Sequence, residues 1–528
     1  MKPDRRFVGR CAAGIASGAA LSLAFASPQL GWLAWIALVP LLVASRDASA
    51  PQGFVAGGLC GAVAAWGVFG WLFVLPAFGA AQFVVLGLYV AVYPACWCAG
   101  VAMSARRHVP LAISAPTLWI ALDLLRSHAG FMALPWATLA QSQQANLAVL
   151  QVAALGGEAA VTFVVVLGNV AIASLLQRRA WRGAFVAAAT VGGVHAGGAL
   201  VLAGNDGASV PVPVAAVQPS IGLQERDSES GREAIWQRLQ QLTQQAALAR
   251  PAVIVWPETA VGDPRHDLRL AARLQALAAT TGTALIVGAS ETEKFAAADA
   301  AGLAVRAQEN YNSAYLVQAG AAPVDPYRKR RLVPFGEYTP LAGIVPWPGW
   351  LVPEIVVGRA GDSDAAFRLA PSSAVPGLQD GLRIGVLICW ENEFAALSRQ
   401  AVQGGAQLIV QLTNDAWFGH TRAAEQHNAA SVLRAVENRV PIVIASNTGP
   451  SQVIDAYGRV QARVAGRFEQ GVAVAGVSVG TAGTPYSRTG ELFSFGCVAC
   501  AALALLRPGR AQRRAPAIQP ATPAQEAT

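Results

Sequence analysis

The distribution of apolar residues along this 528-residue chain constrains its fold more than any other feature. Hydrophobic residues make up 54% of the chain and charged residues only 13%, which is too apolar for an ordinary soluble enzyme. Several of the apolar stretches are about 16 residues long, fewer than the roughly 20 that a straight membrane span needs, so their ends are approximate. We still expect an integral membrane protein, with seven spans before a centre of mixed composition and one after it. The predicted spans are 10–26, 31–45, 54–76, 81–104, 110–125, 159–176, 184–203 and 490–506.

Basic residues beside these spans predict the orientation of the chain. They precede the first span and follow the second, fourth, sixth and last, so that all of them fall on one side of the membrane: Lys2, Arg5, Arg6, Arg46, Arg106, Arg107, Arg178, Arg179, Arg182, Arg507, Arg510, Arg513 and Arg514. By the positive-inside rule both termini are then cytoplasmic, and the centre lies in the periplasm of a bacterial inner membrane. These cytoplasmic clusters, facing anionic lipid, explain the net charge of +8 better than binding to nucleic acid would, since no nucleic-acid motif is visible.

Composition divides the chain into four predicted parts. Residues 1–204 form an N-terminal membrane domain of about seven transmembrane helices, and residues 205–487 form a periplasmic catalytic domain with a sizeable core. Residues 488–507 form a C-terminal transmembrane helix. Residues 508–528 are rich in Arg, Ala, Pro and Gln, and we expect a disordered cytoplasmic tail.

The centre alternates short β-branched runs with helical patterns, which is typical of an α/β fold whose strands are covered by helices. Polar residues stand where several of these runs end, at Glu258, Cys389, Asn414 and Asp415. Ligand sites in α/β sheets gather at such strand ends. Strands are predicted at 212–217, 253–256, 284–287, 313–317, 383–388, 408–412, 442–445, 452–455 and 472–477, and helices at 232–249, 267–280, 393–403 and 423–438.

One of the seven cysteines, Cys389, is placed like a nucleophile. The other six lie in long apolar stretches, whereas Cys389 ends the run Arg383–Ile388 and is followed by Trp390 and Glu391. Most free cysteines are small buried hydrophobes. A lone thiol in an oxidising compartment cannot form a disulfide within its domain, however, and is more readily explained by reactivity.

Glu258 and Lys329 are the predicted partners of Cys389. Lys329 is one of only three lysines against 36 arginines, which indicates a need for a compact ammonium beside a thiolate or an oxyanion. Glu258 would act as general base for the thiol. A Cys–His pair with His420 or His427 remains the rival arrangement, and the seven-residue spacing of these histidines matches no usual zinc site.

The local motifs resemble the nitrilase, or carbon–nitrogen hydrolase, superfamily. Its Glu, Lys and Cys occur in the order of Glu258 in Trp-Pro-Glu-Thr, Lys329 in the segment Tyr327–Tyr338, and Cys389 in Ile-Cys-Trp-Glu. The resemblance implies an α-β-β-α sandwich. It also implies an additional active-site glutamate at Glu337, and supporting or oxyanion-binding roles for Trp390 and Glu391.

The membrane arrangement narrows the resemblance to the apolipoprotein N-acyltransferase family. Segments Phe131–Gln144 and Asn414–Gly419 belong to the matching pattern. The resemblance implies that Cys389 takes an acyl chain from a phospholipid as a thioester and passes it to the amine of S-diacylglyceryl-cysteine on an apolipoprotein. No cofactor or metal is needed. The chain departs from the family pattern at Trp390, where tyrosine is common, and in the charged segment Gln224–Glu229, which has no tryptophan.

The segment Leu341–Pro353 is unusually apolar for a loop, and its Trp347 and Trp350 suit either core cover or a lid that contacts lipid at the membrane surface.

Two other functions of the protein stay open at this point. A membrane-tethered amidase of nitrilase type would hydrolyse a C–N bond with water, although one anchor would be enough for it. A transporter or scaffold would carry the central domain in an inactive form.

Overall fold

A computed structural model describes residues 5–45, 47–76, 78–177, 181–204, 210–298, 304–321, 324–354, 356–364, 366–372, 377–480 and 483–508. Several predictions fall outside the described residues. They concern the tail beyond residue 508, with Arg510, Arg513 and Arg514, and the basic residues Lys2, Arg46, Arg178 and Arg179.

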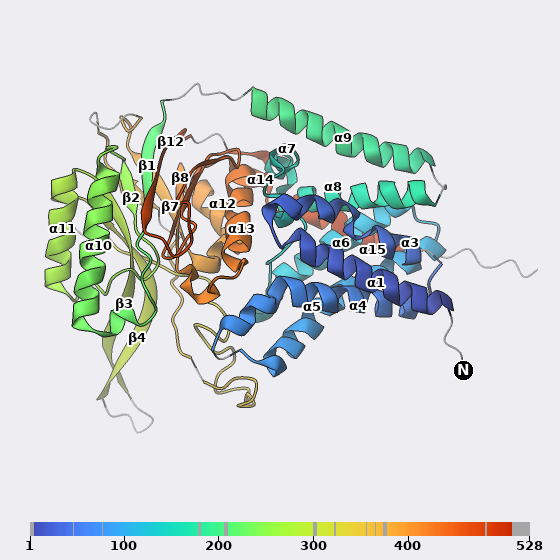
Figure 1. Ribbon diagram of the computed structural model, residues 1–528, viewed down its shortest axis with the longest axis horizontal. Helices are drawn as coiled ribbons and strands as arrows, with labels where there is room; N and C mark the ends of the chain where they lie inside the picture. The colour runs from blue at the N-terminus through green and yellow to red at the C-terminus, as the bar shows by residue number, and fades with distance from the viewer. Residues whose placement is uncertain are drawn as a thin grey trace, which may run out of the picture.

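Apolar helical segments occupy all eight predicted spans and form one bundle (Figure 1). By length and composition six of them could cross a membrane within the described part of the chain: Arg5–Ala24, Pro28–Ser45, Ala50–Val74, Ala80–Arg106, Ala153–Leu176 and Trp181–Ala203. The other two predicted spans are the shorter helices α6 (Leu111–Ser127) and α15 (Leu492–Leu506). The structure therefore confirms a membrane region of about eight apolar segments.

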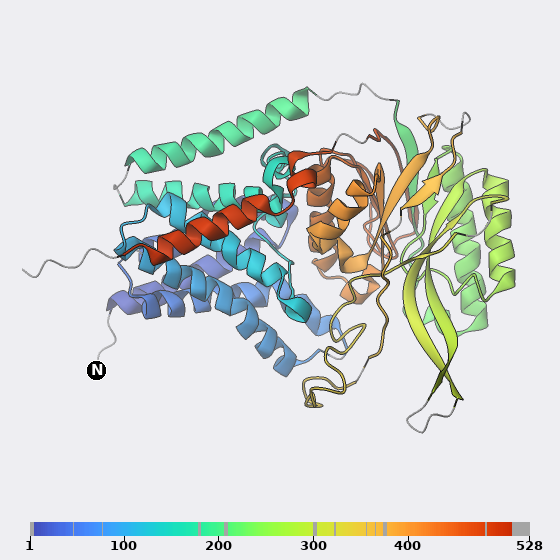
Figure 2. The same cartoon turned by 180° about the vertical axis from the view of Figure 1, so that it is seen from behind.

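The second predicted span is broken into three pieces. It consists of the 3₁₀ helix η1 (Pro28–Leu33) and two short helices, α2 (Ala34–Ala37) and α3 (Val39–Ser45). The remaining long helices are α1 (Arg5–Ala24), α4 (Ala50–Phe69), α5 (Ala80–Arg106), α8 (Ala153–Leu176) and α9 (Trp181–Ala203). In Figure 2, α9 lies at the edge of the bundle, where it packs against α8, and α15 lies along the bundle.

The central residues form two six-stranded mixed sheets within the described part of the chain. The first has the order β12-β1-β2-β3-β4-β5, and the second the order β11-β10-β9-β8-β7-β6. In each sheet three neighbouring strands are parallel, β1 to β3 and β7 to β9, and antiparallel strands flank them. The bounds are β1 (Val212–Gln218), β2 (Val253–Val255), β3 (Ala284–Ala298), β4 (Ala304–Val317), β5 (Tyr327–Arg328), β6 (Phe367–Leu369), β7 (Leu382–Ile388), β8 (Leu408–Thr413), β9 (Ile442–Ser446), β10 (Gln452–Ile454), β11 (Val460–Arg463) and β12 (Gly471–Val477).

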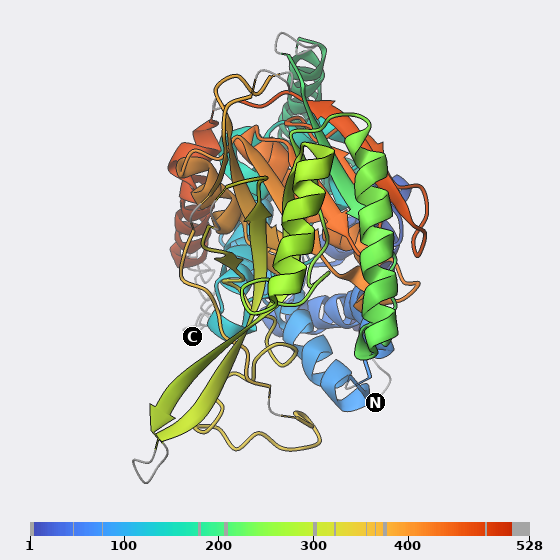
Figure 3. The same ribbon diagram turned by 90° about the vertical axis from the view of Figure 1, so that its left-hand side faces the viewer.

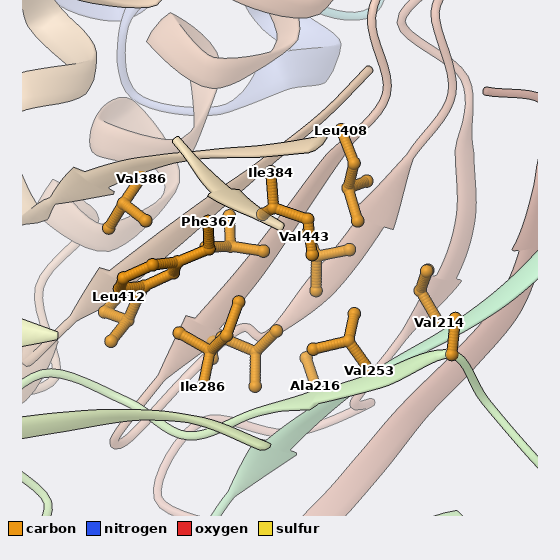
Figure 4. Close-up of a cluster of buried hydrophobic side chains, with 14 of the residues drawn as sticks. Val214, Ala216, Val253, Ile286, Phe367, Ile384, Val386, Leu408, Leu412 and Val443 are labelled. Atoms are coloured by element: carbon orange, nitrogen blue, oxygen red, sulfur yellow. The ribbon is translucent and has the colours of Figure 1, made fainter. Parts of the chain in front are cut away.

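The two sheets pack face to face, and helices cover their outer faces. Between the sheets lies an aliphatic core that includes Val214, Ile286, Ile384 and Val443 (Figure 4). Helices α10 (Glu229–Ala247) and α11 (Leu268–Thr281) cover the first sheet, and α12 (Ala395–Gln403) and α13 (Ala423–Asn438) cover the second. Strands buried on both faces explain the continuous apolar runs of the sequence. The predicted α-β-β-α sandwich is confirmed.

The hairpin of β3 and β4 is longer than predicted, because the structure extends the strands 284–287 and 313–317 into a paired ribbon (Figure 3). Residues such as Glu291 and Thr292 lack the apolar alternation that identifies a half-buried strand. The short strands β5, β6 and β11 were also not predicted, since two to four residues carry no periodic signal.

The membrane helices pack directly against the helical layer of the second sheet. Val161 and Val164 of α8 share an apolar cluster with Leu433 and Val436 of α13. Gly157 of α8, with φ +68°, permits a close approach to the short helix α14 (Pro485–Thr489), because a Cβ atom there would lie 2.5 Å from a ring carbon of Tyr486. The sandwich is thereby held against the bundle.

Candidate active site

Three of the predicted site residues follow the ends of strands, two of them in the first sheet and one in the second. Glu258 comes after β2, Lys329 directly after β5, and Cys389 directly after β7. Carboxyl ends of parallel strands meet at one edge of a sheet, and two stacked sheets bring two such edges together. Hydrogen bonds and charge interactions between these residues show that the fold joins them in one site.

Glu258 is buried, with 8% of its side chain exposed, and both carboxylate oxygens have partners. The Asn312 side-chain amide donates to Oε1 at 2.5 Å, and the Asn414 backbone N–H donates to Oε2 at 2.8 Å. The ammonium of Lys329 lies 3.5 Å from Oε1. Positive and hydrogen-bonding neighbours orient the carboxylate beside the thiol, as a general base requires.

Lys329 is almost fully buried, at 1% side-chain exposure, between two carboxylates. Its Nζ lies 2.7 Å from Glu337 Oε1, and the Val333 N–H donates to the other oxygen of Glu337 at 2.7 Å. Burial alone would lower the pKa of Lys329, but Cys389 when it is ionised and the carboxylates of Glu258 and Glu337 outweigh burial and raise it. Lys329 is therefore a permanent cation fixed in one position.

Cys389 occupies a strained backbone position at the end of β7. Its φ is +53°, a left-handed conformation that residues other than glycine rarely adopt, and the 3₁₀ helix η6 (Cys389–Glu393) starts there. Burial raises the pKa of the thiol well above its usual value, Glu258 adds to the rise, and Lys329 opposes it. The resting side chain is a thiol, so forming the thiolate requires a base.

Glu391 holds the cysteine turn and the lysine strand together. Its carboxylate accepts the N–H groups of Ile388 at 2.8 Å and Arg330 at 2.6 Å, and the hydroxyl of Tyr327 at 2.8 Å. The Arg331 N–H is a fourth donor, at 3.0 Å. Because its oxygens are occupied by these donors, Glu391 supports the geometry of the site.

Trp390 packs against an aromatic cluster shared with the membrane helices, which includes Trp136 and Phe69. Its ring centroid is 5.0 Å from that of Phe394. In the same cluster Trp71, in the 3₁₀ helix η2 (Gly70–Val74) that follows α4, contacts Phe418 with ring centroids 4.8 Å apart. The residue after Cys389 thus connects the site to the bundle.

The two tryptophans of the predicted lid are placed differently. Trp347 is half-buried, packs edge-on against Phe335 at 5.2 Å and donates from its indole to the Pro340 carbonyl at 2.7 Å. Trp350 is 61% exposed, and its carbonyl accepts from the Gln82 side chain at 3.0 Å. Gln82 begins the long helix α5, so this loop is tied to the membrane region.

The histidines of the rival Cys–His arrangement contact other groups. His427 is buried, lies 3.2 Å from Asp415 Oδ1 and stacks on Trp136. The ring of His420 packs on Phe468 at 4.3 Å. The groups named above as acting on the Cys389 thiol are carboxylates and an ammonium, which favours Glu258 as the base.

Asn312 belongs to the site but was not predicted from the sequence. It lies in β4, where its carbonyl accepts the Lys329 N–H at 2.8 Å while its side chain holds Glu258. It thus fixes the two charged residues relative to each other. The available signal was weak: a polar residue directly before the predicted strand 313–317.

Family models and known proteins match this chain over most of its length. A carbon-nitrogen hydrolase family model matches residues 213–485, and a model of the apolipoprotein N-acyltransferase N-terminal domain matches residues 17–171. The apolipoprotein N-acyltransferase of Geobacter metallireducens is 33% identical over 510 residues, covering 93% of each chain. That of Gloeobacter violaceus is 30% identical over 484 residues, covering 86% of each. Among solved structures, an amidase from Nesterenkonia sp. covers 52% of this chain and 93% of its own, with 16% identity and a TM-score of 0.34. The chain belongs to the apolipoprotein N-acyltransferase family, within the carbon–nitrogen hydrolases.

Proposed function

We propose that this enzyme transfers an acyl chain from a membrane phospholipid to the N-terminal amine of S-diacylglyceryl-cysteine on an apolipoprotein. Cys389 carries the acyl group between the two substrates, and Glu258 and Lys329 complete the catalytic set. The observation that supports this most strongly is the buried Lys329 ammonium, which lies 3.5 Å from Glu258 and 2.7 Å from Glu337 and whose charge would favour the ionised form of Cys389. Lipoprotein N-acylation is the activity in the names of the full-length relatives.

In the first half-reaction Glu258 takes the proton of the Cys389 thiol, and the thiolate attacks the ester carbonyl of the phospholipid. Lys329 and the backbone N–H of Trp390 stabilise the tetrahedral oxyanion. The C–O bond to the glycerol breaks, the leaving oxygen takes the proton back from Glu258, and a lysophospholipid departs. Cys389 is left as a thioester.

In the second half-reaction the amine of the apolipoprotein cysteine attacks the thioester carbonyl, and Glu258 accepts its proton. The C–S bond breaks, an amide forms, and the Cys389 thiolate regains a proton from Glu258. The ester and then the thioester supply the free energy. Glu337 would keep Lys329 in place through both steps, since it is the nearer of the two carboxylates.

The aromatic cluster around Trp390 supports a site that opens toward the bilayer. Phe25, Trp71 and Trp136 lie in or beside this cluster at the ends of membrane segments. A path of apolar rings from the nucleophile turn to the bundle suits substrates whose acyl chains stay in the membrane. By the positive-inside rule we assign the central residues 205–487 to the periplasm, with both termini cytoplasmic and membrane segments at 1–204 and 488–507.

We further propose that residues 341–353 form a lid at the membrane surface, with Trp350 in contact with lipid. Trp350 is exposed, whereas Trp347 is half-buried and packs against Phe335, so the two should respond differently. Trp350→Ser should lower acylation from lipid donors severalfold and leave alkylation of Cys389 by iodoacetamide unchanged. Trp347→Ser should lower both. Equal loss of both reactions in Trp350→Ser would show that the loop is core cover.

Intact-mass analysis of the purified protein after incubation with phosphatidylethanolamine tests the mechanism. We expect a mass gain of one acyl chain that is absent in Cys389→Ala and is lost when a diacylated lipopeptide is added. Turnover without any adduct on the protein would contradict the thioester. If water released the acyl group from Cys389 as fast as the lipopeptide does, the result would instead support an amidase-type hydrolase.

A further inference from the structure

The charged segment that departs from the family pattern lies against the catalytic base. Before it, the Ser220 N–H donates to the Asn447 carbonyl and the Ile221 N–H to the Asn447 side chain, each at 2.8 Å. Asn447 in turn donates to the side chain of Asn414 at 2.9 Å, and the Asn414 N–H holds Glu258. The segment is thereby fixed to the site at its start.

Arg226, in the 3₁₀ helix η5 (Glu225–Asp227), attaches the segment to the site a second time. Its Nη1 donates at 2.8 Å to the hydroxyl of Thr259, the residue after Glu258. The charge of Glu258 acts on the guanidinium, but no ion pair within 4.0 Å joins Arg226 to a carboxylate in the part of the chain that the structure describes. The neighbouring Glu225 is engaged by Arg238 at 2.8 Å.

One end of the Arg226 guanidinium is unused. Nη2 is buried and has no hydrogen-bond partner among the described residues. An unmade hydrogen bond on a buried charged group is costly, and such a group calls for an explanation. The guanidinium fork matches the geometry of phosphate oxygens, and Leu223, three residues earlier in the chain, is an apolar side chain with 48% exposure. A cation with an unpaired donor in the same short segment as an exposed apolar residue suits the headgroup end of a lipid.

We propose that Arg226 binds the phosphate of the donor phospholipid and thereby places the ester carbonyl at Cys389. The inference rests on the proposed function, since it names how that site recognises its donor. Phosphate and ester belong to one glycerol, so anchoring the phosphate restricts where the carbonyl lies. The acceptor amine attacks after the lysophospholipid has left, so Arg226 acts in the first half-reaction and not in the second.

The test compares two donors with identical chains, dipalmitoyl phosphatidylethanolamine and dipalmitoylglycerol, which lacks the phosphate. Acylation of Cys389 is followed by intact mass in wild type, Arg226→Gln, Arg226→Lys and the control Arg269→Gln, an exposed arginine of α11. For Arg226→Gln we expect the mole fraction of phosphatidylethanolamine that gives half-maximal acylation to rise on the order of tenfold, the size of one charged hydrogen bond. With dipalmitoylglycerol as donor, Arg226→Gln and wild type should be acylated at the same rate, because this donor has no phosphate to bind. For Arg226→Lys the half-maximal mole fraction of phosphatidylethanolamine lies between the values for wild type and Arg226→Gln. For the control Arg269→Gln it equals the wild-type value.

Discharge of the preformed thioester by a diacylated lipopeptide should be unchanged in Arg226→Gln. The inference is overturned if the maximal rate falls at an unchanged half-saturating fraction, because Arg226 would then act on Glu258. It is also overturned if only the discharge slows, which would assign Arg226 to the acceptor peptide, or if Arg226→Gln behaves like wild type. Absence of any adduct on the wild-type protein would instead contradict the proposed function itself.

Discussion

Two groups of buried charges lie on either side of the turn η6, and they differ in how completely their atoms are paired. The catalytic group, defined as Glu258, Lys329 and Glu337, adjoins Cys389 at the start of the turn. The junction group, defined as Glu158, Arg434, Glu437 and Glu393, includes the last residue of the turn. The same five-residue segment therefore adjoins one group at its first residue and contributes Glu393 to the other at its last.

In the catalytic group each carboxylate is supported by hydrogen-bond donors, and Glu337 keeps 28% of its side chain exposed. In the junction group Arg434 pairs with Glu158 of α8 at 2.6 Å and with Glu437 at 3.1 Å. Glu393 accepts from Gln141 at 2.7 Å, yet its other oxygen has no partner among the described residues. The hydrogen-bonded charges of the catalytic group suit chemistry, whereas the pairs of Arg434 with Glu158 and Glu437 join the membrane helices to the sandwich.

Replacing the base should have the largest effect and should leave the junction intact. Glu258→Gln keeps the shape of the side chain but cannot accept a proton, so acyl transfer should fall by about 10²- to 10⁴-fold. The melting temperature should change little, because the amide can still bond Asn312 or Asn414. Rates and thermal unfolding in the same detergent check this. Activity within tenfold of wild type would remove Glu258 from the mechanism.

Removing the central cation of the junction should have the opposite signature. Arg434→Leu leaves Glu158 and Glu437 without their cation and should cost about 3–5 kcal/mol of folding stability. Alkylation of Cys389 per folded molecule should stay at the wild-type rate. Chemical denaturation measures the free energy of unfolding. The matched control is Arg368→Leu, which removes an exposed arginine of β6. Loss of cysteine reactivity without loss of stability would show that the two groups are not separate.

The smallest expected effect concerns pH. Burial raises the pKa of the Glu393 carboxyl well above its usual value, so it is protonated in the folded protein and ionises only on unfolding. Its contribution to stability is present below the unfolded pKa of about 4.3 and is lost as the pH rises toward the folded value. Glu393→Gln removes this dependence. Between pH 5 and pH 6 wild type should lose about 1 kcal/mol more stability than the variant. If the curves of unfolding free energy against pH were parallel for wild type and Glu393→Gln, Glu393 would be ionised in the folded state.

Much of the fold could be predicted because its signals are local. The strand predicted at 383–388 is β7 with one residue added, and the helix predicted at 423–438 is α13. Broken pieces such as α2 and α3, and the extension of β3 and β4, could not be predicted, since they depend on what packs against them. Cys389 and Glu258 were identified because each follows an apolar run within a motif, and Lys329 because the chain has only three lysines and this one lies within a motif.

Asn312 and Arg226 carry no such mark, and their importance comes from what they contact across the fold. By itself the sequence determined that the chain enters a membrane, that its centre is an α/β sandwich, and which thiol is exceptional. Hydropathy and strand periodicity act over a few neighbouring residues, so they can be read along the chain. Only the tertiary structure decided which buried charges face the thiol and which join the domains. That choice depends on partners a few ångströms away in space that come from distant parts of the chain.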